Sequence, residues 1–362
     1  ISVVTNSGYE MANRIIKDAD SIIYYPLDLP WLAAHVLRRV SPRVFLPVET
    51  ELWPNFLRAA REMHIPVMMA NGRISDKSVS RYHHLHSLLD DMIGTVTKFA
   101  MQSPIDAEYI VRLGADPNLV IVTGNTKFDQ TYTDVSQEEK QQLLQEMGLA
   151  GSREIFLAGS THKGEDELVL RAFTALRKEF PQAKLVIAPR DLLRTGEIAS
   201  LCRRAGFQVA RRTELLKTPG TGHDVVLLDT IGELGKVYSV GDVIYVGGSP
   251  TPHGGHNILE PAAHGKAIIV GYNMFNFKDT HVLLTKRNAC VTVNNGSELT
   301  REVLRLFENS EERHRMEQET LAIVSENKGA ARKSAVLLHE MLDACEEERL
   351  ASGIIHATEK VE

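Results

Sequence analysis

The sequence predicts an α/β protein built from two doubly wound domains. Short, solidly apolar runs alternate with helical patterns along the chain, and such runs are typical of parallel strands buried on both faces. A polar stretch at residues 130–137 interrupts this rhythm once, and the rhythm then resumes. The length of 362 residues is enough for two domains of ordinary size.

The first domain is predicted at residues 1–135, and the chain enters it directly on an apolar strand. The helix expected at 54–63 has a proline in its first turn, where a backbone N–H is not needed. Strands are predicted at 1–5, 21–25, 44–48, 66–70, 98–102 and 119–122, and helices at 8–17, 31–39, 54–63, 78–92 and 104–113. We expect a parallel sheet covered by helices on both faces.

The second domain is predicted at residues 136–362 and repeats the pattern. A charged helix at 137–147 opens it, and three helices at 297–307, 311–325 and 330–350 close the chain. Strands are predicted at 155–158, 184–188, 225–228, 243–246, 267–270 and 290–293. The polar segment at 211–223, which carries glycine and proline, is interpreted as an insert without assigned chemistry.

Composition indicates a globular protein, with 43% hydrophobic and 24% charged residues. The three cysteines, Cys202, Cys290 and Cys345, fit no disulfide or zinc spacing, which favours a reducing compartment. No run approaches the roughly 18 apolar residues of a membrane span, so any membrane contact is expected to be peripheral or upstream of Ile1. No dense basic run with interleaved aromatic residues indicates nucleic-acid binding.

A glycine-rich loop follows the strand predicted at 243–246. Gly254 and Gly255 lie between two histidines, and Asn257 and Glu260 come next at the spacing of a helix capping box. A glycine loop that leads into a helix N-terminus offers free N–H groups and a positive dipole end to a phosphate. The alternative is that Asn257 and Glu260 only begin the helix.

Two motifs of this chain resemble the signatures of the Kdo transferases, which move 3-deoxy-D-manno-octulosonic acid (Kdo) from CMP-Kdo to lipid A precursor. They are GGSPTPHGGHNILEPAAHGKAIIVG with the following FNFKD, and ETELWPN at residues 49–55. The resemblance implies the GT-B fold, with two Rossmann-like domains facing each other across a cleft that holds the ligand. It also implies an inverting glycosyltransferase of lipopolysaccharide biosynthesis that uses neither metal nor cofactor.

The resemblance further implies partners and a location. The donor is CMP-Kdo and the acceptor is the lipid A precursor lipid IVA. The expected location is the cytoplasmic face of the bacterial inner membrane, in peripheral contact with it.

Two candidate catalytic residues follow predicted strands of the first domain, and ligands of open α/β sheets bind at such carboxyl ends. Glu49 could polarise a sugar hydroxyl, with Glu51 two residues on as a second carboxylate or as the cap of the next helix. Lys127 could meet a phosphate or the Kdo carboxylate, or could instead pair with Asp129. The resemblance implies that Glu49 and Lys127 support the transition state.

The candidate nucleotide site belongs to the second domain. Pro189 is expected to end its strand and to aim Arg190 outward. Thr230 and Glu233 have capping-box spacing, so structure alone could explain them. The resemblance assigns CMP binding to Pro189, Arg190, Ile231, Gly232, Glu233, Asn257, Ile258, Leu259 and Glu260, with Glu260 on the ribose diol. Gly254, Gly255 and Ser160 are the phosphate-loop candidates.

No metal site is predicted, because neither His253 with His256 nor His83 with its neighbours has further ligands at zinc spacing. The resemblance implies that the general-base glutamate belongs to a segment upstream of Ile1, so we expect this chain to bind CMP without transferring Kdo at the family's rate. The alternatives are a sugar-nucleotide epimerase of the same architecture and a two-lobed small-molecule binding protein.

Overall fold

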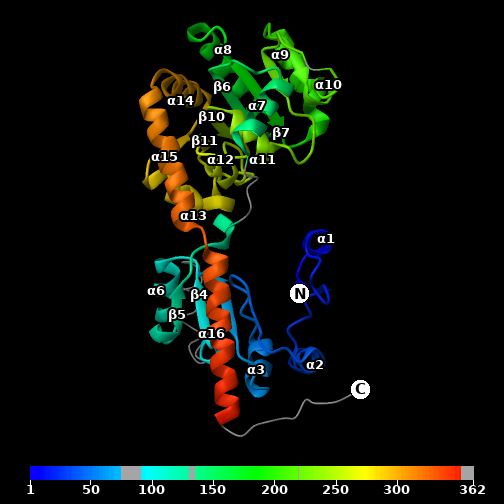
Figure 1. Ribbon diagram of the computed structural model, residues 1–362, viewed down its shortest axis with the longest axis vertical. Coiled ribbons are helices and arrows are strands. Elements are labelled where there is room, and N and C mark those ends of the chain that lie inside the picture. The colour runs from blue at the N-terminus through cyan, green and yellow to red at the C-terminus, as the bar shows by residue number, and fades with distance from the viewer. Residues whose placement is uncertain (75–90, 130–134, 219, 352–362) are drawn as a thin grey trace. The chain divides into compact units, whose positions relative to one another are not determined.

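The protein is described here by a computed structural model that covers residues 1–74, 91–129, 135–218 and 220–351. The chain divides into two compact units (Figure 1). One consists of Ile1–Asp129 together with Asn327–Glu362, and the other of Gln130–Glu326. The helices predicted at 137–147, 297–307 and 311–325 are present in the second unit, but the one predicted at 330–350 belongs to the first unit. The second unit therefore ends before the final helix, not at residue 362.

A seven-stranded, all-parallel sheet forms the centre of the second unit, with the order β12-β11-β10-β6-β7-β9-β8. Six of its strands confirm the predicted ones, and β8 at one edge was not predicted. The strands are β6 (Ile155–Thr161), β7 (Lys184–Pro189), β8 (Val209–Arg211), β9 (Val225–Leu227), β10 (Val243–Val246), β11 (Ala267–Gly271) and β12 (Cys290–Val293).

Helices cover both faces of this sheet. The alternating side chains that include Phe156 and Tyr245 point to one face, where they form a core with α8, α9 and α14. On the other face α12 contacts β11, and a short 3-10 helix contacts β6. The helices and short turns of this unit are α7 (Gln137–Glu146), α8 (Glu165–Glu179), η3 (Leu192–Arg194), α9 (Thr195–Arg204), α10 (Arg212–Leu215), α11 (Leu234–Val237), η4 (Tyr238–Val240), α12 (Leu259–Ala263), η5 (Phe275–Phe277), α13 (Lys278–Lys286), α14 (Gly296–Glu308) and α15 (Ser310–Asn327).

The first unit contains a smaller parallel sheet, β3 (Met68–Gly72), β4 (Lys98–Met101) and β5 (Val120–Val122). The strand predicted at 44–48 is wrong as a continuous strand, because only Phe45 and Val48 form bridges, to Val67 and Ala70. Pro47 lies between them and has no N–H to donate to the ladder. β1 (Ser2–Val3) and β2 (Ile23–Tyr24) pair in parallel with each other, as a separate two-stranded sheet.

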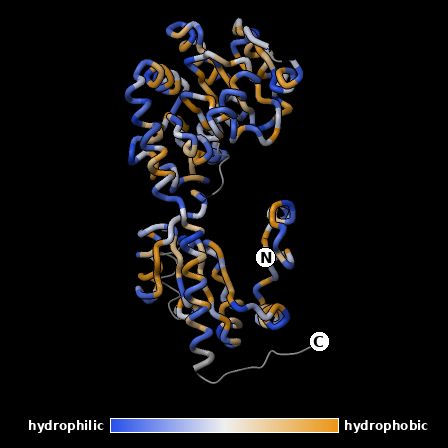
Figure 2. Tube along the Cα trace, in the orientation of Figure 1, coloured by the Kyte–Doolittle hydropathy of each residue, from blue (hydrophilic) through white to orange (hydrophobic). Residues whose placement is uncertain are grey.

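The helices of the first unit are α1 (Asn6–Ile15), α2 (Pro30–Val40), α3 (Pro54–Glu62), α6 (Pro104–Arg112) and α16 (Ala330–Ala351), with the 3-10 turns η1 (Pro117–Leu119) and η2 (Thr126–Asp129). α16 packs against β3 and β4, where Leu337 and Met341 join Met68 and Ala100 in a buried cluster. This contact explains why the last helix belongs to the first unit. Figure 2 shows apolar residues concentrated along the strands and mixed with polar ones along the helices.

The helix predicted at 78–92 lies mostly outside the described residues. Within the part of the chain that the structure describes, no helix is both long enough and apolar enough to cross a bilayer.

Candidate functional site

The structure brings the two predicted catalytic residues of the first unit together. Lys127 Nζ lies 3.9 Å from Glu49 Oε1, and both side chains are about two-fifths exposed. Glu49 follows the bridge at Val48 and adopts a left-handed backbone with φ of 59°, which is unusual for a residue with a side chain. Lys127 lies in η2, which follows β5 after a three-residue connection. A carboxylate and an ammonium therefore stand side by side at the carboxyl ends of these strands.

Side-chain amides that the sequence analysis missed hold the Lys127 segment. The Asn71 carboxamide oxygen accepts from Thr126 N at 3.0 Å, and the Asn125 carboxamide oxygen accepts from Lys127 N at 2.9 Å. Gln102 links the two residues, because it donates to the main-chain oxygen of Asn71 at 2.9 Å and accepts from Asn125 Nδ2 at 2.8 Å. Asn71 lies next to the last residue of β3, and Gln102 and Asn125 follow β4 and β5, and that placement was the available signal.

Helix α3, which follows Glu49, is capped by a residue far from it in sequence. Asp28 accepts from Asn55 N and Phe56 N, both at 3.1 Å, so it satisfies two free N–H groups of the first turn. The predicted capping role of Glu51 is therefore wrong. Glu51 instead accepts from Trp53 Nε1 at 2.7 Å.

In the second unit, Pro189 is the last residue of β7, as predicted, and Arg190 is exposed directly after it. Arg190 N donates to Thr161 O at the end of β6, at 3.0 Å. Ser160, one residue earlier, has a left-handed φ of 56°. The ends of the two central strands β6 and β7 thus present Ser160 and Arg190 at the same edge of the sheet.

A buried carboxylate organises the turn after β10, and the sequence analysis did not identify it. Glu165, which is 0% exposed, accepts from Gly248 N at 2.9 Å and from His162 N at 2.6 Å. The Tyr245 hydroxyl donates to its other oxygen at 2.7 Å. The pKa of the Glu165 carboxyl is raised, because the effect of burial outweighs that of the three donors, which lower it. Glu165 therefore ties the start of α8 to the loop that contains Gly254 and Gly255.

Three histidines from this loop and from the β6–α8 turn stack on one another. The rings of His162 and His253 have centroids 4.1 Å apart, and His162 Nε2 lies 2.7 Å from His256 Nε2, within hydrogen-bond distance. Burial, with help from the neighbouring His162 and Arg190, lowers the pKa of His256 to about 4. In the described residues, no cluster of His, Cys, Asp and Glu has an arrangement that could hold a metal ion.

Gly254 and Gly255 both adopt left-handed φ angles, 85° and 76°. A Cβ added to Gly254 would lie 2.5 Å from Phe275 and Asn276 atoms, and one added to Gly255 would lie 2.3 Å from the Met274 sulfur. Residues 274–276 therefore leave no room for a Cβ at either position, and this packing explains why both residues are glycine. The Gly255 N–H donates to Gly248 O at 2.9 Å, so it is already used within the loop, and the Gly254 N–H remains the phosphate-loop candidate.

The helix predicted to begin at Asn257 begins two residues later, at Leu259, and has only five residues. Asn257 Oδ1 accepts from Leu259 N at 3.0 Å, and Asn257 Nδ2 donates to Glu260 Oε1 at 3.2 Å. The predicted reciprocal capping box is thus not formed, and Ile258 takes the capping position. Burial raises the pKa of the Glu260 carboxyl, while Asn257 and the nearby Arg190 lower it. Among the residues that the structure describes, Asn257 alone donates to the Glu260 carboxylate, so its other oxygen is available to a ligand near Arg190.

The capping box predicted from Thr230 to Glu233 is also wrong. α11 begins at Leu234, and its capping residue Glu233 makes no side-chain bond to the helix. The Glu233 carboxylate accepts from Arg212 Nε and Nη2 at 3.3 and 3.2 Å, and from the Thr230 hydroxyl. Ile231 between them is 89% exposed.

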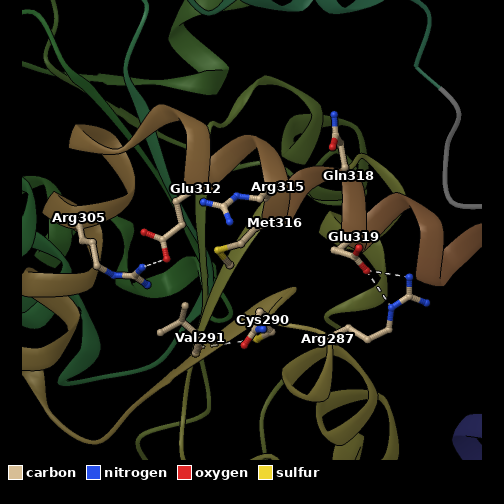
Figure 3. A pocket seen from close by; sticks show the side chains of 10 residues that line it. Arg287, Cys290, Val291, Arg305, Glu312, Arg315, Met316, Gln318 and Glu319 are labelled. Atoms are coloured by element: carbon tan, nitrogen blue, oxygen red, sulfur yellow. Dashed lines mark hydrogen bonds and ion pairs between the residues drawn. The ribbon is translucent and has the colours of Figure 1, made fainter.

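A pocket of about 420 Å³ lies elsewhere in the second unit, beside the edge strand β12 (Figure 3). Arginines and glutamates make up half of its lining residues, and two of the arginines are paired, Arg287 Nε with Glu319 at 2.9 Å and Arg305 with Glu312. The lining residues are Arg287, Asn288, Cys290, Val291, Arg305, Glu312, Arg315, Met316, Gln318 and Glu319. None of the predicted site residues lines this pocket.

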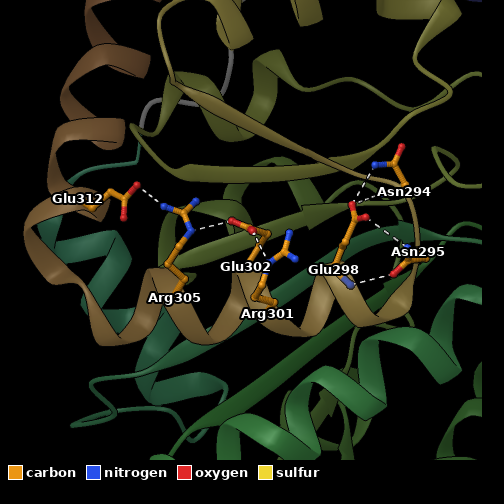
Figure 4. A network of polar contacts seen from close by, with 7 residues as sticks. All are labelled: Asn294, Asn295, Glu298, Arg301, Glu302, Arg305 and Glu312. Carbon is orange, nitrogen blue, oxygen red and sulfur yellow. Dashed lines mark hydrogen bonds and ion pairs between the residues drawn. The ribbon is translucent and has the colours of Figure 1, made fainter.

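One of these arginines, Arg305, ties α14 to α15 (Figure 4). Arg305 lies between Glu302, at 2.7 Å, and Glu312 of the next helix. At the start of α14, Asn295 accepts from Glu298 N at 2.9 Å and so caps the helix. We interpret the polar residues around this pocket as a structural network of the outer helices.

Comparison with known proteins shows similarity to 3-deoxy-D-manno-octulosonic acid transferases. A family model described as 3-deoxy-D-manno-octulosonic-acid transferase (kdotransferase) matches residues 1–130. The 3-deoxy-D-manno-octulosonic acid transferase of Haemophilus influenzae is 32% identical to this chain over 345 residues, covering 94% of this chain and 79% of that protein. The bifunctional glycosyltransferase/methyltransferase of Fusobacterium nucleatum is 36% identical over 320 residues, or 86% of this chain. This chain spans 49% of the length of that protein.

Among solved structures, the UDP-GlcNAc 2-epimerase from Neisseria meningitidis bound to UDP-GlcNAc is similar with a TM-score of 0.60. The match covers 94% of this chain and 91% of that one at 15% identity, so the likeness concerns the fold alone. That fold is the GT-B fold, as predicted.

Proposed function

This chain belongs to the 3-deoxy-D-manno-octulosonic acid transferase family, and from that premise we propose that it takes Kdo from CMP-Kdo and attaches it to the lipid A precursor lipid IVA. The observation that carries the proposal is the group formed by Arg190, Glu260 and His256. Arg190 follows β7, while His256 and Glu260 lie in the loop and helix after β10, at the carboxyl ends of strands of one parallel sheet. The charge of Arg190 acts on both His256 and Glu260.

Arg190 and Glu260 supply complementary recognition of CMP. The exposed Arg190 guanidinium can donate to the phosphate, with the N–H groups of Ser160 and Gly254 as further proposed donors. The Glu260 carboxylate can accept from both hydroxyls of the ribose. Main-chain groups of residues 231–233, with the exposed Ile231 side chain, are the proposed contact for the base.

In the proposed reaction, a hydroxyl oxygen of the acceptor attacks the anomeric carbon of Kdo while the bond from that carbon to the phosphate oxygen breaks. CMP leaves with the bonding electrons, and the stereochemistry at the anomeric carbon inverts. Lys127 is proposed to stabilise charge that develops in the transition state, and Glu49 to orient Lys127 and the acceptor. The hydroxyl proton passes to a base, a role that we do not give to Glu49, because its carboxylate is paired with Lys127.

We propose that no metal takes part, because cations and N–H groups of the chain can balance the charge of the leaving CMP. A lipid acceptor also implies work at a membrane surface, and we propose peripheral contact with the cytoplasmic face of the bacterial inner membrane.

The proposal is tested by mass spectrometry of a reaction that contains CMP-Kdo and lipid IVA. We expect release of CMP together with an acceptor that has gained one or more Kdo units, and no loss of either product in excess EDTA. Release of CMP without a modified acceptor would contradict the transfer proposal. An isomerised sugar nucleotide would indicate an epimerase, and binding of CMP-Kdo without any conversion would indicate a binding protein. Loss of activity in EDTA that zinc or magnesium restores would contradict metal independence.

A further inference from the structure

We infer that Arg212 is a positioning residue, which holds the loop from Asp229 to Glu233 in the shape that selects the base of the nucleotide. The inference rests on the proposed function, because it assumes that this loop faces a nucleobase. It goes beyond that function in assigning base selectivity to a buried residue that no motif of the sequence marks.

The loop presents an apolar side chain to solvent while its own backbone is constrained. Ile231 at its centre is 89% exposed. Gly232 has a left-handed φ of 87°, and a Cβ added there would meet no atom within 4 Å. An exposed isoleucine on an anchored loop is a suitable surface for the flat face of a base.

Two successive residues at the start of α10 hold the two ends of this loop. Thr213 donates from its N–H and its hydroxyl to the two oxygens of Asp229, at 2.9 and 2.7 Å. Arg212 binds both oxygens of Glu233, at 3.2 and 3.3 Å. A shift of α10 would therefore move both ends of the loop at once.

Burying the Arg212 guanidinium costs stability, which argues against a purely structural role. It is 2% exposed, and it is also bonded to Glu146 at the end of α7, at 2.8 Å. In the described part of the chain its buried Nη1 has no hydrogen-bond partner, and an unsatisfied buried donor costs stability. Two-point binding of Glu233 needs the planar fork of a guanidinium, which a lysine cannot reproduce.

The arrangement changes the role expected of Glu233. Arg212 and Thr230 occupy its carboxylate, so we infer that Glu233 serves the nucleotide through the loop's main chain. Main-chain groups can tell pyrimidines apart, because cytosine presents an amino donor where uracil presents a keto acceptor. Main-chain groups can discriminate between the two bases only when the backbone is held in one conformation, which is the role that we assign to Arg212.

The test is calorimetric titration of the full chain and its variants with CMP, UMP, GMP and AMP. We expect Arg212→Met to weaken CMP by about 10- to 100-fold and to bring the CMP and UMP dissociation constants closer together. Arg212→Lys should retain part of the affinity but less of the selectivity. Glu146→Gln is the matched control, because it alters the other partner of Arg212 and leaves the contact with Glu233. Its CMP affinity should change by no more than about twofold.

Far-UV circular dichroism and thermal unfolding decide whether Arg212→Met is folded, and Thr213→Val tests the other end of the loop if it is not. A folded Arg212→Met protein with the parental CMP-to-UMP ratio would overturn the inference, as would an equal loss in Glu146→Gln. If the parent protein prefers another nucleotide of the panel, the proposed donor is wrong, and the Arg212 variants are judged on that nucleotide. If the parent binds none of the four, both proposals fail.

Discussion

Glu49 and Lys127 form an ion pair of 3.9 Å across the edge of the small sheet, although each was predicted from a different motif. Both side chains are about two-fifths exposed, so solvent screens their attraction and the pair adds little stability. Meanwhile Asn71 and Asn125 fix the backbone around Lys127. A weak pair on a well-held backbone is the arrangement expected of groups that act on a ligand.

The first prediction follows from this contrast. Glu49→Gln and Lys127→Met should each lower kcat for Kdo transfer by at least about 100-fold, because each removes a group proposed to support the transition state. The free energy of unfolding should change by no more than about 1 kcal/mol. Steady-state kinetics and urea unfolding measure the two quantities.

Arg58 and Glu62 supply the control for this experiment, since they form an exposed ion pair of 3.1 Å on α3. Arg58→Met should leave both kcat and stability near the parental values. Equal losses of activity in the Arg58 and Lys127 variants would show that a general charge effect, and not the proposed role, accounts for the result.

The second prediction concerns the ribose. Glu260→Ala should weaken CMP binding by roughly 1.5–3 kcal/mol, the size expected for a hydrogen bond to a charged group. Calorimetry with CMP and with 2′-deoxy-CMP measures this effect, and the variant should discriminate less between the two. Glu319→Gln, beside the pocket at β12, is the control. Unchanged CMP affinity in a folded Glu260→Ala protein would remove the ribose assignment.

The strands of the second unit were predictable because their residues are apolar throughout, and β10 and β12 were predicted at the observed bounds. The strand at 44–48 failed because the apolar pattern concealed the effect of Pro47 on the ladder. Both predicted capping boxes failed for another reason. Spacing alone cannot tell whether a carboxylate binds its own helix or a distant partner, as Glu233 binds Arg212.

The predicted site residues lie in short sequence motifs, whereas the residues that support them can be recognised only from tertiary contacts. Asp28 caps α3 from another segment, and Glu165 holds a turn that follows it by some eighty positions in the chain. No local pattern marks either carboxylate. The resemblance identified the candidate ligand contacts, but it could not indicate what holds them in place.

The third prediction separates the backbone strain at Gly255 from its packing. Gly255→Ala should destabilise the second unit by about 1–3 kcal/mol and weaken CMP, because its Cβ would lie 2.3 Å from the Met274 sulfur. Gly151→Ala is the matched control, since Gly151 has a similar φ of 80° but open space around its Cβ. Its cost should be smaller and CMP binding unchanged. Equal effects at the two positions would show that backbone strain alone explains the glycines of the loop.

The last prediction concerns acid stability. The folded protein lowers the pKa of His256 to about 4, below its ordinary value of 6.5, mainly through burial. Between these two values the unfolded chain binds a proton that the folded chain does not, so this residue makes stability fall as the pH decreases from 6.5 toward 4. Urea unfolding at several pH values should show a smaller loss over this range for His256→Gln than for the parent protein.

Comparison with the parent at each pH is needed because Glu165 acts in the opposite sense. Its pKa is raised in the folded state, so its contribution to stability increases as the pH falls. His339→Gln, on the exposed side of α16, should leave the parental pH dependence unchanged. If His256→Gln and His339→Gln give the same pH profile as the parent, His256 does not stay neutral in the folded protein. The stacked histidines beside Arg190 would then carry a positive charge close to the CMP phosphate.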